Sequence, residues 1–153
     1  MKKVGLLLLS FLLILVISGC DKKEEKFYLE DNYYVSEEME DVPGTKIEEL
    51  EDNEESFAVF VYMASCTSCA HFDKILESFL EEHPIKIYKV SLLNIKGTKM
   101  EGNVKFSPSI VLYNKGEIVS YLNAISDDDM RYYQSKEDLK EWLEQYIYLE
   151  KNN

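Results

Sequence analysis

The feature that most constrains the fold is a pair of cysteines between a continuous apolar run and an amphipathic segment. Residues 57–63 read FAVFVYM, with no charged or amide side chain. Such a run predicts a strand buried on both faces, as in a parallel or mixed sheet. Cys66 and Cys69 follow it, and apolar residues then recur at helical spacing over residues 72–80. That spacing predicts a helix that ends near His83 and packs on the sheet.

A thiol at the junction of a strand and a helix has a chemical advantage. The free backbone N–H groups and the dipole of the helix favour negative charge there. They lower the pKa of such a thiol and make it a better nucleophile. A second thiol one turn into the helix can attack a mixed disulfide and release the substrate. We therefore assign Cys66 as the nucleophile and Cys69 as the resolving thiol, with Ser65, Thr67 and Ser68 as supporting residues.

The other apolar segments alternate between helix and strand patterns. Thr45 with Glu48, and Ser135 with Asp138, are typical helix-capping pairs. Helices are predicted over residues 45–53 and from residue 136 onward, and strands over residues 85–90, 109–113 and 117–122. This alternation predicts an α/β fold with a central mixed β-sheet flanked by helices on both faces.

The amino-terminal residues are typical of a secretory signal. Two lysines precede an almost wholly apolar stretch over residues 4–17, and small residues follow it. The stretch is shorter than the roughly 18–20 residues that a membrane-spanning helix needs. A transmembrane anchor is therefore the weaker interpretation.

The end of this segment, Ile17-Ser18-Gly19-Cys20, resembles the bacterial lipobox. The resemblance implies cleavage before Cys20, a lipid on its thiol, and a location at the extracytoplasmic face of the bacterial cell membrane. The alternative is a buried cysteine that happens to follow an apolar stretch. With Cys20 lipidated, the three cysteines of the chain reduce to one pair in an oxidising compartment.

The expected organisation is a signal peptide over residues 1–19, a lipidated tether and linker over residues 20–44, and one domain over residues 45–150. Residues 21–26 are all charged and predict a disordered spacer. Residues 27–44 mix aromatic and acidic side chains and predict a loose segment with at most one short edge strand. The formal net charge of −12 argues against nucleic acid as a partner, because phosphates would be repelled.

Over residues 45–150 the chain resembles the thioredoxin superfamily. The matching pieces are FAVFVYMASCTSC, the amphipathic helix after it, SPSIVLYNKGEIVSYLNAIS and SKEDLKEWLEQYI. The resemblance implies a thioredoxin-like fold in which Pro108 is a cis-proline beside the cysteine pair and Ser107 lends its backbone to a bound substrate. It also implies thiol–disulfide exchange on cysteine-containing exported proteins, with a redox partner protein and no cofactor.

The chain departs from that family at several positions. Ser65 stands where thioredoxins carry tryptophan, and Phe106 stands where they carry glycine. Phe60 occupies the place of a buried aspartate that accepts a proton, so the matching lysine, Lys89, lacks its expected partner. These departures leave exchange chemistry open, in either direction. They also admit a non-catalytic accessory or binding lipoprotein, of the bacteriocin-export or metallochaperone type.

Three narrower interpretations of the cysteines compete with a redox role. Zinc or copper could use Cys66, Cys69, His71 and His83 as ligands. However, Cys69 and His71 lie two positions apart on a helix, so their side chains diverge. Covalent haem needs a histidine where the chain has Ala70, and a purely structural disulfide would close too short a loop to stabilise the fold much. We therefore expect no metal and no cofactor.

Overall fold

The computed structural model of the protein describes residues 25–34, 37 and 39–151. The expected signal peptide over residues 1–19, the lipidated Cys20 and most of the charged spacer lie outside the described residues. Within the described ranges, no helix combines the length and the apolar character that crossing a bilayer requires.

The centre of the molecule is a five-stranded mixed sheet in the order β1-β3-β2-β4-β5. Strands β1, β3 and β2 run parallel to one another, and β4 and β5 are antiparallel to their neighbours. The bounds are Met39–Asp41 for β1, Phe57–Tyr62 for β2, Ile87–Ser91 for β3, Ser109–Asn114 for β4 and Glu117–Tyr121 for β5. The predicted mixed sheet is thus confirmed.

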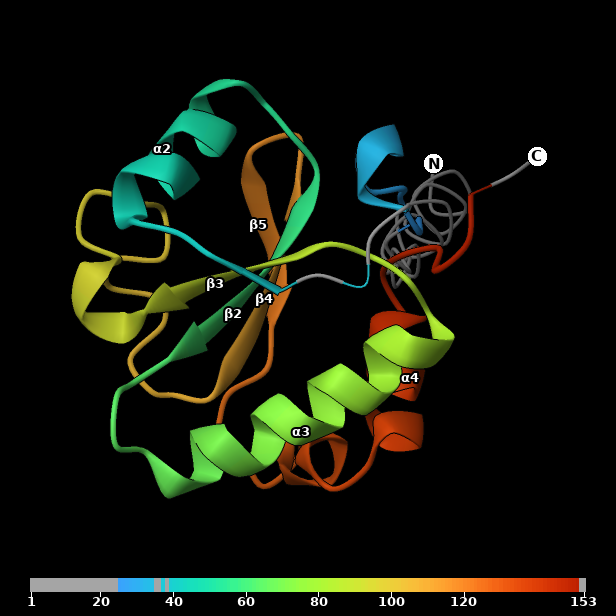
Figure 1. The fold of residues 1–153 in the computed structure, drawn as a ribbon. Helices are drawn as coiled ribbons and strands as arrows, with labels where there is room; N and C mark the ends of the chain where they lie inside the picture. Colours follow the sequence, from blue (N-terminus) through green and yellow to red (C-terminus); the bar gives the residue numbers. More distant parts are fainter. Residues whose placement is uncertain (1–24, 35–36, 38, 152–153) are drawn as a thin grey trace, which may run out of the picture.

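Helices cover both faces of this sheet, as the alternation of patterns predicts. Figure 1 shows α3 and α4 side by side on one face and α2 on the other. Their bounds are Gly44–Asp52 for α2, Thr67–Glu82 for α3 and Lys136–Leu143 for α4. Three short 3₁₀ turns complete the described elements: η1 at Asp31–Tyr33, η2 at Leu92–Asn94 and η3 at Met130–Tyr133.

The core lies where β2 meets α3. Residues 57–61 of β2 are all buried, since the strand has a neighbour on each side and a helix on each face. Phe72 of α3 packs edge-on against Phe60, with ring centroids 5.8 Å apart. Each such phenyl ring contributes about 2–3 kcal/mol when it leaves water. This packing fixes the direction in which the chain leaves β2 and enters α3.

The helix starts follow tertiary packing as well as capping chemistry. The cap at Ser135 is confirmed, because its hydroxyl accepts a hydrogen bond from the backbone N–H of Asp138. The cap at Thr45 is wrong: α2 begins at Gly44 after Pro43, with no side-chain cap. A Cβ at Gly44 would lie 1.9 Å from the carbonyl oxygen of Asn94, so the backbone of η2 leaves room only for glycine at this first helical position.

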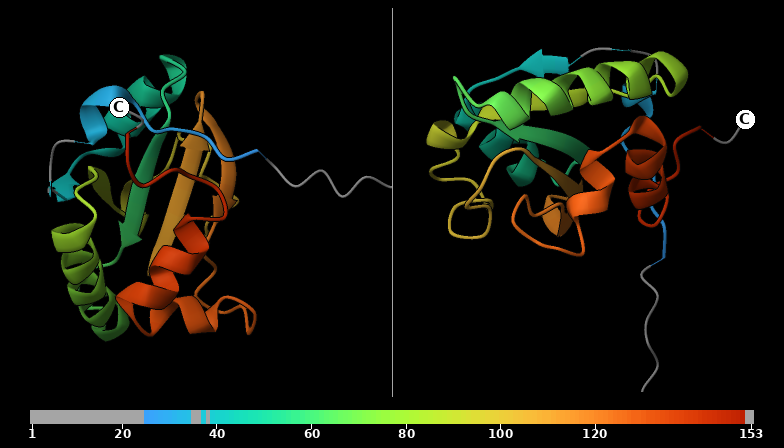
Figure 2. Two further views of the ribbon diagram at one scale, coloured as in Figure 1. Left: turned by 90° about the vertical axis from the view of Figure 1, so that its right-hand side faces the viewer. Right: turned by 90° about the horizontal axis from the view of Figure 1, so that it is seen from below.

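The packed domain begins at Phe27, earlier than the expected boundary at residue 45. Phe27 forms a bridge with Ile147, and Tyr28 stacks on Tyr148 with ring centroids 4.3 Å apart. Leu29 and Tyr33 are each only 2% exposed. Figure 2 shows this segment beside the carboxyl-terminal segment. We call residues 27–34 with residues 146–149 the terminal clamp.

The reason for this difference is the spacing of the aromatic and aliphatic residues before residue 45. Their buried side chains face the domain, while acidic neighbours such as Asp31 face solvent. The single edge strand that the sequence admits here is present as β1, which pairs with β3. Residues 27–34 and 39–44 are therefore part of the fold and not a linker.

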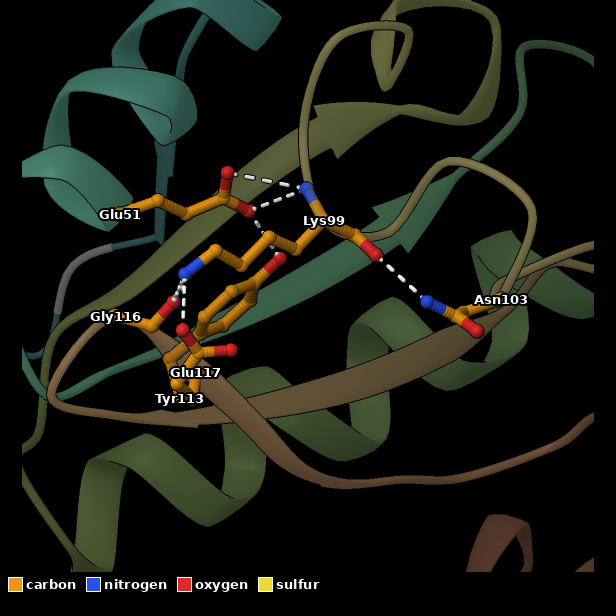
Figure 3. A network of polar contacts seen from close by, with 6 residues as sticks. All are labelled: Glu51, Lys99, Asn103, Tyr113, Gly116 and Glu117. Atoms are coloured by element: carbon orange, nitrogen blue, oxygen red, sulfur yellow. Dashed lines mark hydrogen bonds and ion pairs between the residues drawn. The ribbon is translucent and has the colours of Figure 1, made fainter.

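A buried carboxylate connects α2 to the long segment between β3 and β4 (Figure 3). Glu51, only 6% exposed, accepts hydrogen bonds from the Lys99 backbone N–H at 2.8 and 3.0 Å and from the Tyr113 hydroxyl at 2.7 Å. The Lys99 ammonium donates in turn to the Gly116 carbonyl at 2.8 Å and to Glu117 at 2.6 Å. These contacts hold residues 95–104 against the rest of the domain.

Glu51→Ala is expected to lower the free energy of unfolding by about 3 kcal/mol, because it leaves the buried Tyr113 hydroxyl and the partly buried Lys99 backbone N–H without an acceptor. Glu49→Ala is the matched control, since Glu49 is an exposed carboxylate of the same helix. Urea denaturation of the two variants and the wild type measures the difference. Equal stability of the two variants would show that the network contributes nothing.

Candidate active site

The first cysteine lies at the junction that the sequence predicts. Strand β2 ends at Tyr62, and α3 begins at Thr67 with Cys66 as its N-cap residue. Ser65 adopts a left-handed conformation with φ 63°, and the Cys66 backbone N–H donates to the Met63 carbonyl at 3.3 Å. This tight turn places the Cys66 sulfur at the amino-terminal end of the helix.

The two cysteines form a disulfide, with Cα atoms 5.2 Å apart. Two donors surround the Cys66 Sγ: the Cys69 backbone N–H at 3.1 Å and the Ser68 hydroxyl at 3.2 Å. Cys69 is only 4% exposed, whereas Cys66 is half-buried and Thr67 and Ser68 are exposed. Cys66 is thus the sulfur that another molecule can reach, and its surroundings favour negative charge.

The predicted substrate-binding residues share a groove with Ser68, which lies between the two cysteines in the sequence. The Ser107–Pro108 peptide bond is cis, as the resemblance implies, and β4 begins at the next residue. A groove of about 280 Å³ is lined by Ser68 of α3 together with Ser107 and Pro108. The structure therefore brings the cysteine pair and the proline loop, separated by about forty positions in the sequence, to one place.

Tyr133 of η3 also lines this groove. Its hydroxyl donates to the Pro108 carbonyl at 2.9 Å, and its ring lies against Phe72 with centroids 4.8 Å apart. Burial is the main cause that raises the pKa of Tyr133, so the phenol remains a donor across the physiological range. Sequence reasoning missed this residue, because a tyrosine in an acidic loop carries no signal of its partner.

A second groove, of about 480 Å³, has the disulfide in its lining. Its lining includes both cysteines, Phe60, Asp73 and Lys89. The Lys89 ammonium donates to both carboxylate oxygens of Asp73, each at 2.8 Å. The inference that Lys89 lacks an acidic partner is therefore wrong. Its partner comes from α3 instead of from the position of Phe60 in β2.

The donors for a metal ion do not converge in the described part of the chain. No group of three or more His, Cys, Asp or Glu side chains there could hold a metal ion. His71 is exposed on α3 and lines the groove beside Ser68. His83 lies at the opposite end of the same helix, where its ring contacts Phe79.

The arrangement of strands and helices is similar to that of solved thioredoxin structures. A mutant thioredoxin from Halobacterium salinarum NRC-1 superimposes with a TM-score of 0.54 at 21% identity, over 73% of this chain and 93% of that chain. This chain has the thioredoxin fold. The prediction of a thioredoxin-like α/β fold is confirmed.

Two other thioredoxins are also similar. Mitochondrial thioredoxin 3 from Saccharomyces cerevisiae, in its oxidized form, gives a TM-score of 0.45 at 16% identity, over 54% of this chain and 80% of that chain. Thioredoxin f2 from Chlamydomonas reinhardtii gives 0.48 at 18% identity, over 61% and 90%. No model of a known protein family and no curated protein sequence matches the chain.

The thioredoxin fold here carries a cysteine pair with CxxC spacing at the start of a helix that packs on the sheet. A likeness at this identity establishes the fold. The chemistry of the protein therefore depends on its own cysteines, grooves and charged side chains.

Proposed function

We propose that the protein is a thiol–disulfide oxidoreductase in which Cys66 is the nucleophile and Cys69 the resolving thiol. The observation that carries the proposal is the unequal exposure of the two sulfurs. Cys66 is half-buried at a helix N-terminus beside an open groove, and Cys69 is buried behind it. A structural disulfide has no need of one reachable sulfur with two donors around it.

The reaction transfers two electrons between two cysteine pairs. In the reducing direction, the Cys66 thiolate attacks one sulfur of a substrate disulfide, and the other substrate sulfur leaves as a thiolate. The Cys69 thiolate then attacks the Cys66 sulfur, and the first substrate sulfur leaves. The substrate gains two electrons and two protons, and the Cys66–Cys69 disulfide forms. Oxidation of a substrate dithiol follows the same steps in reverse.

The groove beside Pro108 suits an extended, cysteine-bearing segment of a substrate protein. No hydrogen bond among the described residues uses the backbone of Ser107, so its groups are free to pair with a second chain. The exposed apolar side chains of Phe106, Ile125 and Met130 line the same groove. We propose that cysteine-containing exported proteins, and a redox partner protein, dock there.

We also propose that the protein works at the extracytoplasmic face of the bacterial cell membrane, held by a lipid on Cys20. The support is the sequence of residues 1–20 alone. Mass spectrometry of the protein from its native membrane is expected to show an amino-terminal peptide that begins at lipidated Cys20. Cys20→Ser is expected to remove the lipid mass and to retain residues 1–19. An unmodified Cys20 in the wild-type protein would refute the anchor.

The exposed apolar side chains that line the groove beside Pro108 also favour a second candidate, a non-catalytic binding lipoprotein. Phe106, Ile125 and Met130 would serve such a protein as a docking surface without any exchange at the cysteines. This candidate predicts that a variant with both Cys66 and Cys69 changed to serine keeps its partner. Loss of the partner in that variant would exclude it.

The test of the proposed function is catalysis by the wild-type protein in two assays. One follows the reduction of insulin disulfides by dithiothreitol, and the other follows the oxidation of a reduced protein by glutathione disulfide. We expect acceleration in at least one of them. No acceleration in either assay would overturn the proposal.

A further inference from the structure

We propose that Asp73 is the proton acceptor for the Cys69 thiol in the step that releases the substrate. The proposal rests on the exchange function proposed above and names the group that completes its second half. The difficulty that it solves is local: Cys69 must become a thiolate to attack, yet its side chain is almost wholly removed from water. A buried thiol gives up its proton reluctantly unless a base is near.

The position of Asp73 on α3 suits this task. It follows Cys69 by four residues, and side chains four positions apart on a helix are neighbours on one face. Both residues line the second groove, and among the described residues that line it Asp73 is the only carboxylate. A proton can pass from the Cys69 sulfur to Asp73 directly or through one water molecule.

Lys89 of β3 holds this carboxylate in place. Its ammonium bonds both oxygens of Asp73 at 2.8 Å, and the two side chains are only 19% and 28% exposed. Each carboxylate oxygen retains a free lone pair, because an ionised carboxylate can accept about four hydrogen bonds. Asp73 is therefore oriented by Lys89, with acceptor capacity left toward the groove.

Tyr62 is another titratable group near the Asp73–Lys89 ion pair, and it does not compete with Asp73 for the proton. Tyr62 of β2 donates to Asp41 of β1 at 2.9 Å, and its ring lies 5.1 Å from the Lys89 ammonium. The hydrogen bond to Asp41 is the main cause that raises the pKa of Tyr62, and the charge of Asp73 adds to it. Tyr62 thus stays protonated and accepts no proton from Cys69.

The step balances as follows. The mixed disulfide joins Cys66 to the substrate, and Cys69 is a thiol. The proton of Cys69 moves to an Asp73 oxygen, and the Cys69 thiolate forms a bond to the Cys66 sulfur. The bond between Cys66 and the substrate breaks, and the substrate sulfur leaves as a thiolate that takes up the proton from Asp73 or from water.

The test uses the reduced full chain, purified in mild detergent, with dithiobis(nitrobenzoate) as the disulfide probe. Attack by Cys66 releases one thionitrobenzoate in a phase that depends on the probe concentration. Attack by Cys69 releases the second in a unimolecular phase, which is the step that Asp73 serves. A variant in which Cys66 and Cys69 are both changed to serine identifies any reaction of Cys20 with the probe.

Asp73→Asn is expected to slow the unimolecular phase at neutral pH by on the order of a hundredfold, the usual size of a general-base effect. The concentration-dependent phase should change less than about threefold, because Asp73 serves the second step only. Glu77→Gln, which removes an exposed carboxylate one turn further along α3, is the matched control and should change neither phase. An unimolecular phase equal in Asp73→Asn and wild type would overturn the proposal.

Lys89→Gln distinguishes two roles of Asp73: that of a proton acceptor, and that of a partner in an ion pair that only stabilises the structure. It removes the cation that orients Asp73 but leaves the carboxylate, so the unimolecular phase should slow clearly less than in Asp73→Asn. Equal slowing in Asp73→Asn and Lys89→Gln would overturn the proposal.

The wild type supplies a test that needs no variant. A base within the protein removes the need for hydroxide from solution, so the unimolecular rate should be nearly constant between about pH 5 and 7. A tenfold fall per pH unit throughout that range would overturn the proposal. Absence of any unimolecular phase in the wild type would instead refute the exchange function itself, so the two failures are distinguishable.

Discussion

Cys66→Ser is expected to abolish turnover, whereas Cys69→Ser is expected to preserve the first half of the reaction. Only Cys66 is reachable at the helix N-terminus, so its loss removes the attacking sulfur. We expect the rate of insulin disulfide reduction to fall by roughly three orders of magnitude or more. Cys69→Ser keeps Cys66 but removes the thiol that resolves the mixed disulfide.

The two variants give different products as well as different rates. Cys69→Ser, mixed with a disulfide substrate, should accumulate a covalent adduct on Cys66 that dithiothreitol removes. Cys66→Ser should form little adduct, because Cys69 is buried. Ser126→Ala, a substitution in a loop, is a control that should match the wild type in both measurements. Equal adduct yields on Cys66 and Cys69 would contradict the assigned roles.

A chain that begins at Thr45, the boundary expected from sequence patterns, is expected not to fold stably. It lacks β1 and the buried side chains of Leu29, Tyr33 and Val42. Each of these side chains contributes about 1.5–3 kcal/mol through burial, and the loss of strand pairing adds to that. The sum approaches the whole stability of a typical domain, about 5–15 kcal/mol.

The matched control for this truncation is a chain that begins at Glu25 and keeps the terminal clamp intact. Circular dichroism and urea denaturation should show a cooperative transition for the longer chain and none, or a strongly shifted one, for the shorter. Equal midpoints in the two chains would mean that residues 27–44 are a linker after all.

The parts of the fold that sequence patterns predict best are those fixed by local composition. The apolar run of β2, the spacing along α3 and the cap at Ser135 each depend on neighbouring residues, and all three are confirmed. The same holds for the position of Cys66 at the start of α3. The cis bond before Pro108 follows from the resemblance to the thioredoxin superfamily and not from local pattern.

The parts that sequence patterns miss depend on contacts between distant segments. The backbone of η2 lies against Gly44 at the start of α2, and no capping rule includes that contact. The terminal clamp needs Tyr148 to cover Tyr28, and these residues are separated by most of the domain. The sequence shows that Asp73 follows Cys69 by four residues. The ion pair between Asp73 and Lys89 of β3 depends on the tertiary fold, so no local pattern predicts it.

The most direct test of the exchange function is the reduction potential of the Cys66–Cys69 couple. The protein is equilibrated in dithiothreitol or glutathione buffers, and the free thiols are alkylated and counted by mass. We expect both cysteines to become reduced together, with a midpoint between about −120 and −270 mV, the range of exchange proteins. A disulfide that stays intact until well below about −300 mV would mark the pair as structural and contradict the proposed function.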